Sequence, residues 1–177
     1  GKSRRFGRDK LLEPWGHQGQ VLVQRPIEAL LAVFGPRVML VGECHPAIIP
    51  LADGVIPDNY PGIGPIGGIL AALEAWAGPV FVVAGDMPGV EPGTIETIVR
   101  AALAAPNAWA TLAVTDRTHQ CAGLYTQSCK PSLQLAIQEQ RFKLASAIPE
   151  TRVLLVPCPP DAVTNINSVS AMPANPS

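Results

Sequence analysis

The chain has few charged residues and few aromatic ones. Of its 177 residues, 15% are charged and 5% are aromatic, and the formal net charge is −1. So small a net charge excludes a surface specialised for binding nucleic acid or an anionic membrane. A disordered chain would combine low hydrophobicity with high net charge, whereas 47% of these side chains are hydrophobic. The composition therefore indicates a globular protein.

Long apolar runs and metal-binding cysteine pairs are also missing. No run reaches the roughly 18 apolar residues that a membrane helix needs, and no signal-peptide pattern opens the sequence. Four cysteines in a chain of this length form no disulfide framework, and none of them shows the C-x-x-C spacing of a zinc site; they are Cys44, Cys121, Cys129 and Cys158. We therefore expect a reducing compartment, the cytoplasm, and no membrane partner.

Apolar segments separated by glycine and proline make up most of the sequence. The patterns predict helices at about 26–35, 65–77, 92–104, 131–139 and 142–148, and strands at about 38–41, 80–84, 109–114, 121–125 and 152–156. This alternation predicts an α/β, three-layer Rossmann-like domain with a mostly parallel central sheet flanked by helices. We expect one domain over residues 1–168, followed by a loose tail at 169–177.

Some of these elements carry more specific expectations. The runs 38–41 and 80–84 are apolar at nearly every position, so both strands should be covered on both faces, and the second should be a central parallel strand. Helical spacing places Trp76 and Leu103 on the inward faces of their helices. In a doubly wound sheet, ligands bind beyond the carboxyl ends of the strands.

The first candidate motif is the N-terminal segment, which has five Lys or Arg residues among its first ten. Glycines allow backbone N–H groups to approach an anion closely, and Lys and Arg add charge and donors. A phosphate-binding loop and a frayed basic terminus are both compatible with this composition. A P-loop is excluded, because the upstream glycine and strand that it requires are absent.

The second motif is GIGPIG at residues 62–67, which matches G-x-G-x-x-G, with Asp86 about 20 residues further on. A nicotinamide dinucleotide site is one interpretation. The segment before it, residues 56–61, is too short and too rich in proline to be a good first strand. The match is therefore weak support for an oxidoreductase.

Two further motifs are polar residues near strand ends. Asp86 follows the apolar run 80–84 and should face the crevice, where it could hold Mg²⁺ together with substrate phosphates or cap the next helix. Asn165 and Asn167 lie two positions apart, so in an extended chain their amides point the same way. They could orient a ligand or hold a loop.

Taken in order, these segments resemble the molybdenum cofactor guanylyltransferases, and more broadly the small NTP transferases of the same fold. The resemblance rests on residues 1–10, on Asp58 with the turn 64–68, on residues 86–88 and on residues 165–168. Residues 120–125 are similar to a further strand of the family, with Cys121 in place of its proline. The family's first strand has no counterpart from Gly1 onward, so either the chain is a fragment or another element takes that place.

The resemblance implies a Mg²⁺-dependent transfer of GMP from GTP to the phosphate of molybdopterin, with release of pyrophosphate. Lys10 and Arg5 would hold phosphate oxygens, and Asp86 would hold Mg²⁺. The remaining residues would contact the substrates: Gly1, Lys2, Ser3 and Asp58 on the nucleotide side, and Asn165 and Asn167 on the pterin side. Transient contacts with the proteins that deliver and receive the cofactor are a further expectation.

Three alternatives stay open at this point. The first is the same chemistry with another substrate pair, such as CTP with the pterin, or a sugar phosphate. The second is a nucleotide-binding module without catalysis, and the third is the dinucleotide oxidoreductase suggested by residues 62–67. Asp9, the acidic residue before Lys10, favours the guanylyl branch through the resemblance.

Overall fold

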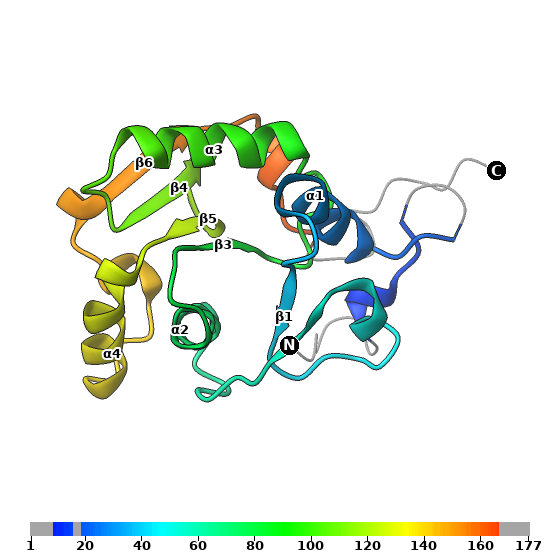
Figure 1. Ribbon diagram of the computed structural model, residues 1–177, viewed down its shortest axis with the longest axis horizontal. Helices are drawn as coiled ribbons and strands as arrows, with labels where there is room; N and C mark the ends of the chain where they lie inside the picture. Colours follow the sequence, from blue (N-terminus) through cyan, green and yellow to red (C-terminus); the bar gives the residue numbers. More distant parts are fainter. Residues whose placement is uncertain (1–8, 16–18, 167–177) are drawn as a thin grey trace.

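The computed structural model describes residues 9–15 and 19–166, and its main sheet lies between two layers of helices (Figure 1). The α/β fold class expected from the sequence is confirmed. The helices are α1 (Gln24–Phe34), α2 (Pro65–Ala75), α3 (Pro92–Ala104) and α4 (Lys130–Gln138). The strands are β1 (Met39–Val41), β2 (Gly54–Ile56), β3 (Val80–Val83), β4 (Ala110–Val114), β5 (Thr118–Tyr125) and β6 (Val153–Pro157).

The main sheet has four strands in the order β3-β5-β4-β6, and it is mixed where we expected it to be mostly parallel. β4 and β6 are parallel, but β5 is antiparallel to both of its neighbours, β3 and β4. Residues 115–117 alone connect β4 to β5, and so short a connection can only join antiparallel strands. β3, β4 and β6 therefore point the same way, and their carboxyl ends meet at one edge.

The expectation that β3 is a central parallel strand is wrong. β3 is the end strand of its sheet, and its four residues are half-buried. Val80 and Val82 pack towards α2 and α4, while Phe81 and Val83 pack towards α1 and α3. The apolar run thus correctly indicated helices on both faces, but burial of two faces does not specify which strands lie alongside.

β1 and β2 form a separate, parallel two-stranded sheet. We expected β1 to be covered on both faces, yet Met39 and Val41 are 43% and 37% exposed. Only the alternate residue, Leu40, joins the cluster of apolar side chains beneath α1. β1 is therefore an alternating, half-covered strand.

Four of the five predicted helices begin and end near their predicted positions, and glycine and proline explain several of the boundaries. The fifth, predicted at about 142–148, is wrong: the backbone of Lys143 is extended, so the segment forms only the short 3₁₀ turn Leu144–Ser146. Gly35 ends α1 with a positive φ of 62°, and Gly64 precedes α2 with a φ of 85°, a region that glycine enters without steric cost. Two predicted inward residues are wrong. Trp76 lies just past the end of α2 and is 56% exposed, and Leu103 in the last turn of α3 is 79% exposed.

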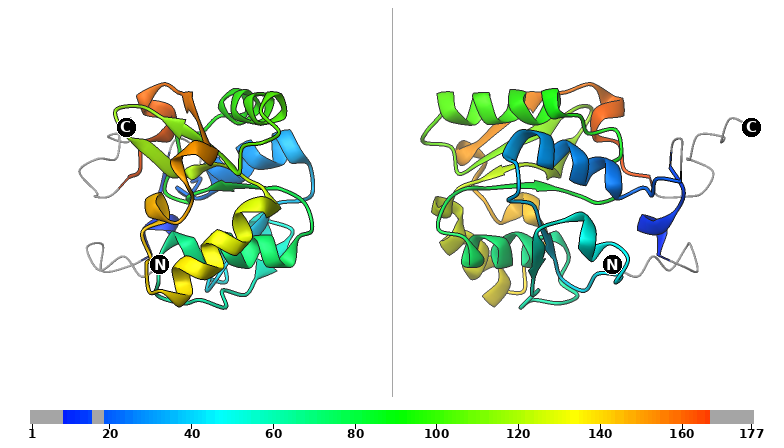
Figure 2. Two further views of the ribbon diagram at one scale, coloured as in Figure 1. Left: turned by 90° about the vertical axis from the view of Figure 1, so that its left-hand side faces the viewer. Right: turned by 45° about the vertical axis from the view of Figure 1, so that its right-hand side comes forward.

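The core consists of two apolar layers, one on each face of the main sheet. α2 and α4 cover one face, and α1 and α3 cover the other (Figures 1 and 2). α2 is the most deeply buried helix, because seven of its residues are buried. It also contacts β1, β2, β3 and β5, and so joins the two sheets. Within the described part of the chain, no helix is long and apolar enough to cross a membrane.

A buried histidine near the start of β5 should make the stability of the protein depend on pH. His119 is 6% exposed, and its Nε2 lies 2.8 Å from Thr115 Oγ1. Burial, and to a smaller extent the positive charge of Arg117, lower the pKa of His119 below its ordinary value of 6.5. The folded protein therefore holds this imidazole neutral at pH values where the unfolded chain protonates it.

We predict that stability falls as the pH drops below about 6.5, because the unfolded state then binds more protons than the folded state. The loss continues down to the lower pKa of the folded protein. Urea unfolding at pH values between 5 and 7 would measure it, with His119→Gln as the control that removes the titrating group. If the free energy of unfolding depended on pH equally in the unchanged protein and in His119→Gln, His119 would not be the group responsible.

Candidate functional site

The candidate site lies at the carboxyl end of β3, where the chain turns sharply at Asp86. Ala84 N–H donates to the carbonyl of Cys121 at 2.9 Å and so ends the pairing with β5. Met87 N–H donates to the carbonyl of Ala84 at 3.1 Å, which closes a turn around Asp86. The Asp86 side chain is 14% exposed, so its carboxylate needs partners within the protein.

Lys10 reaches this carboxylate from the N-terminal part of the chain. Asp9 Oδ1 accepts a hydrogen bond from Leu11 N–H at 3.1 Å and so caps the short helical turn Lys10–Leu12. The turn directs Lys10 Nζ to Oδ2 of Asp86, with which it forms an ion pair. The Lys10 side chain is 17% exposed, so the pair is only partly screened by solvent.

The third participant is the segment after the 3₁₀ helix Pro160–Val163. Asn165 Nδ2 donates to Oδ1 of Asp86 at 2.6 Å, and Ile166 N–H donates to the main-chain carbonyl of Asp86 at 2.8 Å. The carbonyl of Ile166 in turn accepts from Lys10 Nζ at 3.3 Å. Lys10, Asp86, Asn165 and Ile166 form a closed set of contacts, which we call the Asp86 cluster.

Close backbone packing holds the two halves of this cluster together. A Cβ atom at Gly89 would lie 2.1 Å from the carbonyl oxygen of Asp161 and 3.1 Å from its carbonyl carbon. Only glycine therefore allows the loop after Asp86 to rest against the Pro160–Val163 turn. A Cβ at Gly85 would lie 3.1 Å from Val23 Cγ2 and 3.2 Å from a Leu11 methyl group, a contact that is tight but adjustable.

The structure brings together only some of the predicted site residues. Lys10, Asp86 and Asn165 meet directly, although 76 and 79 residues separate Asp86 from Lys10 and Asn165 in sequence. Asp58 lies elsewhere, beside Gly42 at the end of β1, and its Oδ1 accepts from Tyr60 N–H at 2.8 Å. Across residues 9–15 and 19–166, no hydrogen bond or ion pair joins Asp58 to the cluster. The remaining candidates lie outside the described residues: Gly1, Lys2, Ser3, Arg5 and Asn167.

On the sheet side, Asp86 lies near the thiol of Cys121. Burial, and to a smaller extent the negative charge of Asp86, raise the pKa of the neighbouring Cys121 thiol to about 11. Cys121 is therefore a neutral thiol at physiological pH and does not compete for a cation. The described residues contain no group of three or more His, Cys, Asp or Glu side chains that could hold a metal by themselves.

The donor set at Asp86 nevertheless suits a hard cation. Mg²⁺ binds through one or two carboxylates together with substrate phosphates and water, and does not need an all-protein cage. Asp86 supplies such a carboxylate at the carboxyl end of β3, and Asn165 Nδ2 donates a hydrogen bond to its Oδ1. These residues fit Mg²⁺ brought with a polyphosphate.

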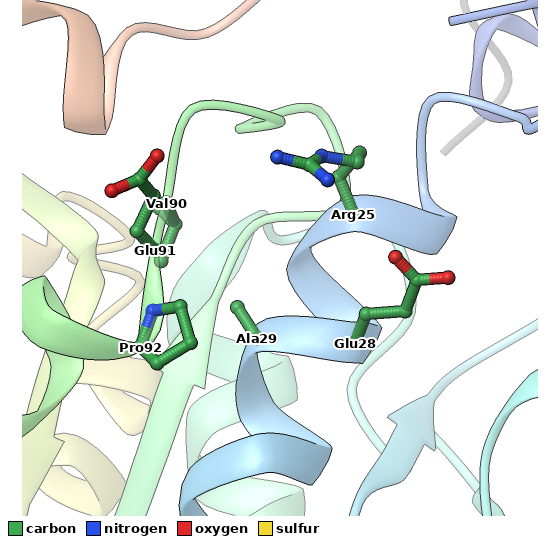
Figure 3. Close-up of a pocket in the computed structure, with 6 residues that line it drawn as sticks. All are labelled: Arg25, Glu28, Ala29, Val90, Glu91 and Pro92. Carbon is green, nitrogen blue, oxygen red and sulfur yellow. The ribbon is translucent and has the colours of Figure 1, made fainter. Parts of the chain in front are cut away.

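A separate depression of about 160 Å³ lies between α1 and the start of α3 (Figure 3). Arg25 on α1 extends across it towards Glu91, and Glu28 on the same helix also lines it but points away from Glu91, so one guanidinium accompanies two carboxylates. Ligand sites for molecules of nucleotide size usually measure about 300–1,000 Å³. The small volume and the acidic lining exclude this depression as the triphosphate site.

Several contributors to the cluster were not predicted from the sequence. Ile166 acts through its backbone groups, and no side-chain pattern signals such a role. Gly89 did leave a signal, since a glycine three residues after Asp86 in a turn suggests a close backbone approach. Asp9 was noted only for the resemblance, but the structure assigns it the cap that orients Lys10.

Comparison with known proteins identifies relatives over most of the chain. The family model for the MobA-like NTP transferase domain matches residues 1–153. A protein named molybdenum cofactor guanylyltransferase from Mycobacterium ulcerans is 30% identical over 192 aligned positions, which cover 98% of this chain and 88% of that protein. A protein of the same name from Chloroflexus aggregans is 33% identical over 102 residues, and the match spans 56% of this chain and about half (49%) of that relative.

Solved structures show the same architecture. Molybdopterin-guanine dinucleotide biosynthesis protein A from Archaeoglobus fulgidus superposes with a TM-score of 0.74 at 25% identity, and the match covers 96% of this chain and 90% of that one. The 4-diphosphocytidyl-2C-methyl-D-erythritol synthase from Anaerococcus prevotii has a TM-score of 0.64 at 11% identity, over 90% of this chain and 84% of that one. The second likeness shows the fold alone.

We predict that Gly89→Ala destabilises the protein by about 1–3 kcal/mol, because the new methyl group overlaps the Asp161 carbonyl and must displace the backbone. Urea unfolding would measure the loss. Gly93→Ala is the matched control, because a Cβ there has nothing within 4 Å and alanine favours the helix. Equal stability of the two variants would show that the loop does not need glycine.

Proposed function

The chain belongs to the MobA-like NTP transferase family, and we propose that it transfers the GMP unit of GTP to the phosphate of molybdopterin, with release of pyrophosphate. The observation that carries this proposal is the Asp86 cluster. It joins the residues of three family motifs at the carboxyl end of β3, the edge where an open α/β sheet binds its ligands.

The proposed reaction needs charge neutralisation and alignment and no nucleophile from the protein. An oxygen of the molybdopterin phosphate attacks the α-phosphorus of GTP. The bond from that phosphorus to the bridging oxygen breaks, and pyrophosphate leaves with the electron pair. Holding the two phosphates in line and neutralising the developing charge can supply most of the rate enhancement.

We propose that Asp86 would hold Mg²⁺ when the substrate phosphates are bound. Nucleotidyltransferases generally use a divalent metal, and Mg²⁺ binds well to a single protein carboxylate joined by substrate phosphates and water. The ion would stabilise negative charge on the phosphate oxygens. Asp86 has a fixed position at the end of β3, so it would determine where along the triphosphate that charge is neutralised.

Lys10 is proposed to bind phosphate oxygens of GTP. Its ammonium lies against Asp86 and carries three donors, so it can contact a phosphate placed at the same carboxylate. We propose that Arg5 and the segment with Gly1, Lys2 and Ser3 add further phosphate donors. Asp58 would serve the nucleotide side from the end of β1, and Asn167 would contact the pterin.

The same proposal includes the cellular setting. It includes transient contacts with the proteins that would deliver the pterin substrate and receive the dinucleotide product. The cytoplasm is the proposed location, in agreement with four free cysteines in the described chain.

The direct test is an assay of pyrophosphate release from GTP, with molybdopterin and Mg²⁺ present. We predict turnover with GTP and little with CTP, and a loss of about 100-fold or more in Asp86→Asn, because the amide cannot neutralise a cation. Thermal shifts with GTP, CTP, ATP and NAD, each with and without Mg²⁺, would follow occupancy independently. Stabilisation by NAD alone, or near-normal turnover of Asp86→Asn, would contradict the proposal.

A second prediction concerns Lys10. Lys10→Ala should weaken GTP binding by roughly tenfold or more, because a charge-assisted hydrogen bond to phosphate is lost. Titration calorimetry with GTP and Mg²⁺ would measure the change. Lys143→Ala removes an exposed cation outside the cluster and should bind GTP normally. Identical titration curves for Lys10→Ala and the unchanged protein would remove Lys10 from the site.

A further inference from the structure

We propose that Asn165 is a positioning residue, whose side-chain amide fixes the carboxylate of Asp86 and leaves Oδ2 for the cationic partner. The inference rests on the proposed function, in which Asp86 holds the metal. It differs from the role that the resemblance implies for Asn165, a direct contact with the pterin or its phosphate.

The first argument is the hydrogen bond itself. Asn165 Nδ2 donates to Oδ1 of Asp86 at 2.6 Å, and Lys10 occupies the other oxygen, Oδ2. The two carboxylate oxygens therefore have different partners, one neutral and one charged. A carboxylate tied at one oxygen cannot rotate freely, so the direction in which Oδ2 points is set by the amide.

The second argument is that Asn165 is itself held firmly. On its two sides, Val163 is fully buried and Ile166 is 7% exposed, so the short segment between them is anchored at both ends. Ile166 N–H also donates to the Asp86 carbonyl at 2.8 Å, which fixes the backbone of Asn165 relative to that of Asp86. Thr164 Oγ1 donates to the Pro160 carbonyl at 2.6 Å and braces the preceding turn.

Together these contacts bind Asp86 through both its main chain and its side chain to the same two-residue segment. A residue that served only a substrate would not need this double attachment. The half-buried Asn165 side chain donates to Asp86 through its amide NH₂ group. A test of the inference therefore has to remove this NH₂ group alone. Replacing that amino group with oxygen changes the hydrogen bond while preserving the shape of the side chain.

Asn165→Asp makes this replacement, and Asn165→Ala removes the group altogether. We expect both variants to bind Mn²⁺, used as a probe for Mg²⁺, about tenfold or more weakly in the presence of saturating GTP, as losses of such supporting contacts do. Water-proton relaxation would report the bound Mn²⁺. Turnover should fall through kcat, with the KM for molybdopterin changed less than about twofold if the pterin contact is elsewhere.

Asn107→Asp is the matched control, because it makes the same chemical change at an exposed asparagine in the connection between α3 and β4. It should leave Mn²⁺ affinity and turnover unchanged. Circular dichroism would establish that each variant is folded. If the added charge of Asn165→Asp prevents folding, the Mn²⁺ affinity of Asn165→Ala tests the inference instead.

Two results would overturn the inference. Unchanged or tighter Mn²⁺ binding by Asn165→Asp would make Asn165 an oxygen ligand of the metal, since aspartate keeps that oxygen. A raised KM for molybdopterin with normal Mn²⁺ affinity would make it a substrate contact.

A measurement without nucleotide separates this inference from the proposed function. Urea unfolding of Asp86→Asn, Asn165→Asp and the double variant forms a double-mutant cycle. We expect non-additive losses of stability, because the two side chains contact each other. Additive losses of stability would overturn the positioning role. Failure of the unchanged protein to bind Mn²⁺ with GTP would instead overturn the proposed function, and the unfolding cycle would still test whether Asn165 and Asp86 are coupled.

Discussion

The negative charge of Asp86 is the constraint on which the arrangement of the site depends. A carboxylate only 14% exposed loses much of its hydration and needs charged or hydrogen-bonding partners. It finds one in Lys10 and another in Asn165, and these come from opposite ends of the described chain. Satisfying this one group therefore brings the N-terminal turn and the Pro160–Val163 segment to the same edge of the sheet.

The sheet places that charge where a ligand can reach it. β3, β4 and β6 run in one direction, so their carboxyl ends open onto a common edge, and β5 fills the space between β3 and β4 by running back (Figure 1). Helices cover both faces, which leaves the strand ends as the accessible part of the main sheet. α2 joins this sheet to the β1–β2 pair, and Asp58 lies at the carboxyl end of that pair.

The different fates of the sequence predictions have physical reasons. Four of the five helices were predicted well, since proline and glycine limit them and their apolar spacing is local. Trp76 and Leu103 were placed inward wrongly, because helical spacing reveals neither that α2 ends at Ala75 nor that Leu103 is exposed in the last turn of α3. β1 was predicted to be covered on both faces because every one of its residues is apolar. That prediction was wrong, since an apolar side chain can remain partly exposed at low cost.

The sequence by itself determined the α/β class, most helix boundaries and the chemical types at the site: a basic N-terminal segment, Asp86 after an apolar strand, and paired asparagines near the C-terminus. Only the tertiary structure decided that Lys10 and Asn165 bind the two oxygens of the same carboxylate, that Asp58 stands apart from them, and that β5 runs against its neighbours. Local patterns indicate which face of a helix or strand is apolar, because that spacing repeats with the geometry of the element itself. Contacts across 76 and 79 residues depend instead on how the packed layers close around the sheet, and no local pattern encodes that.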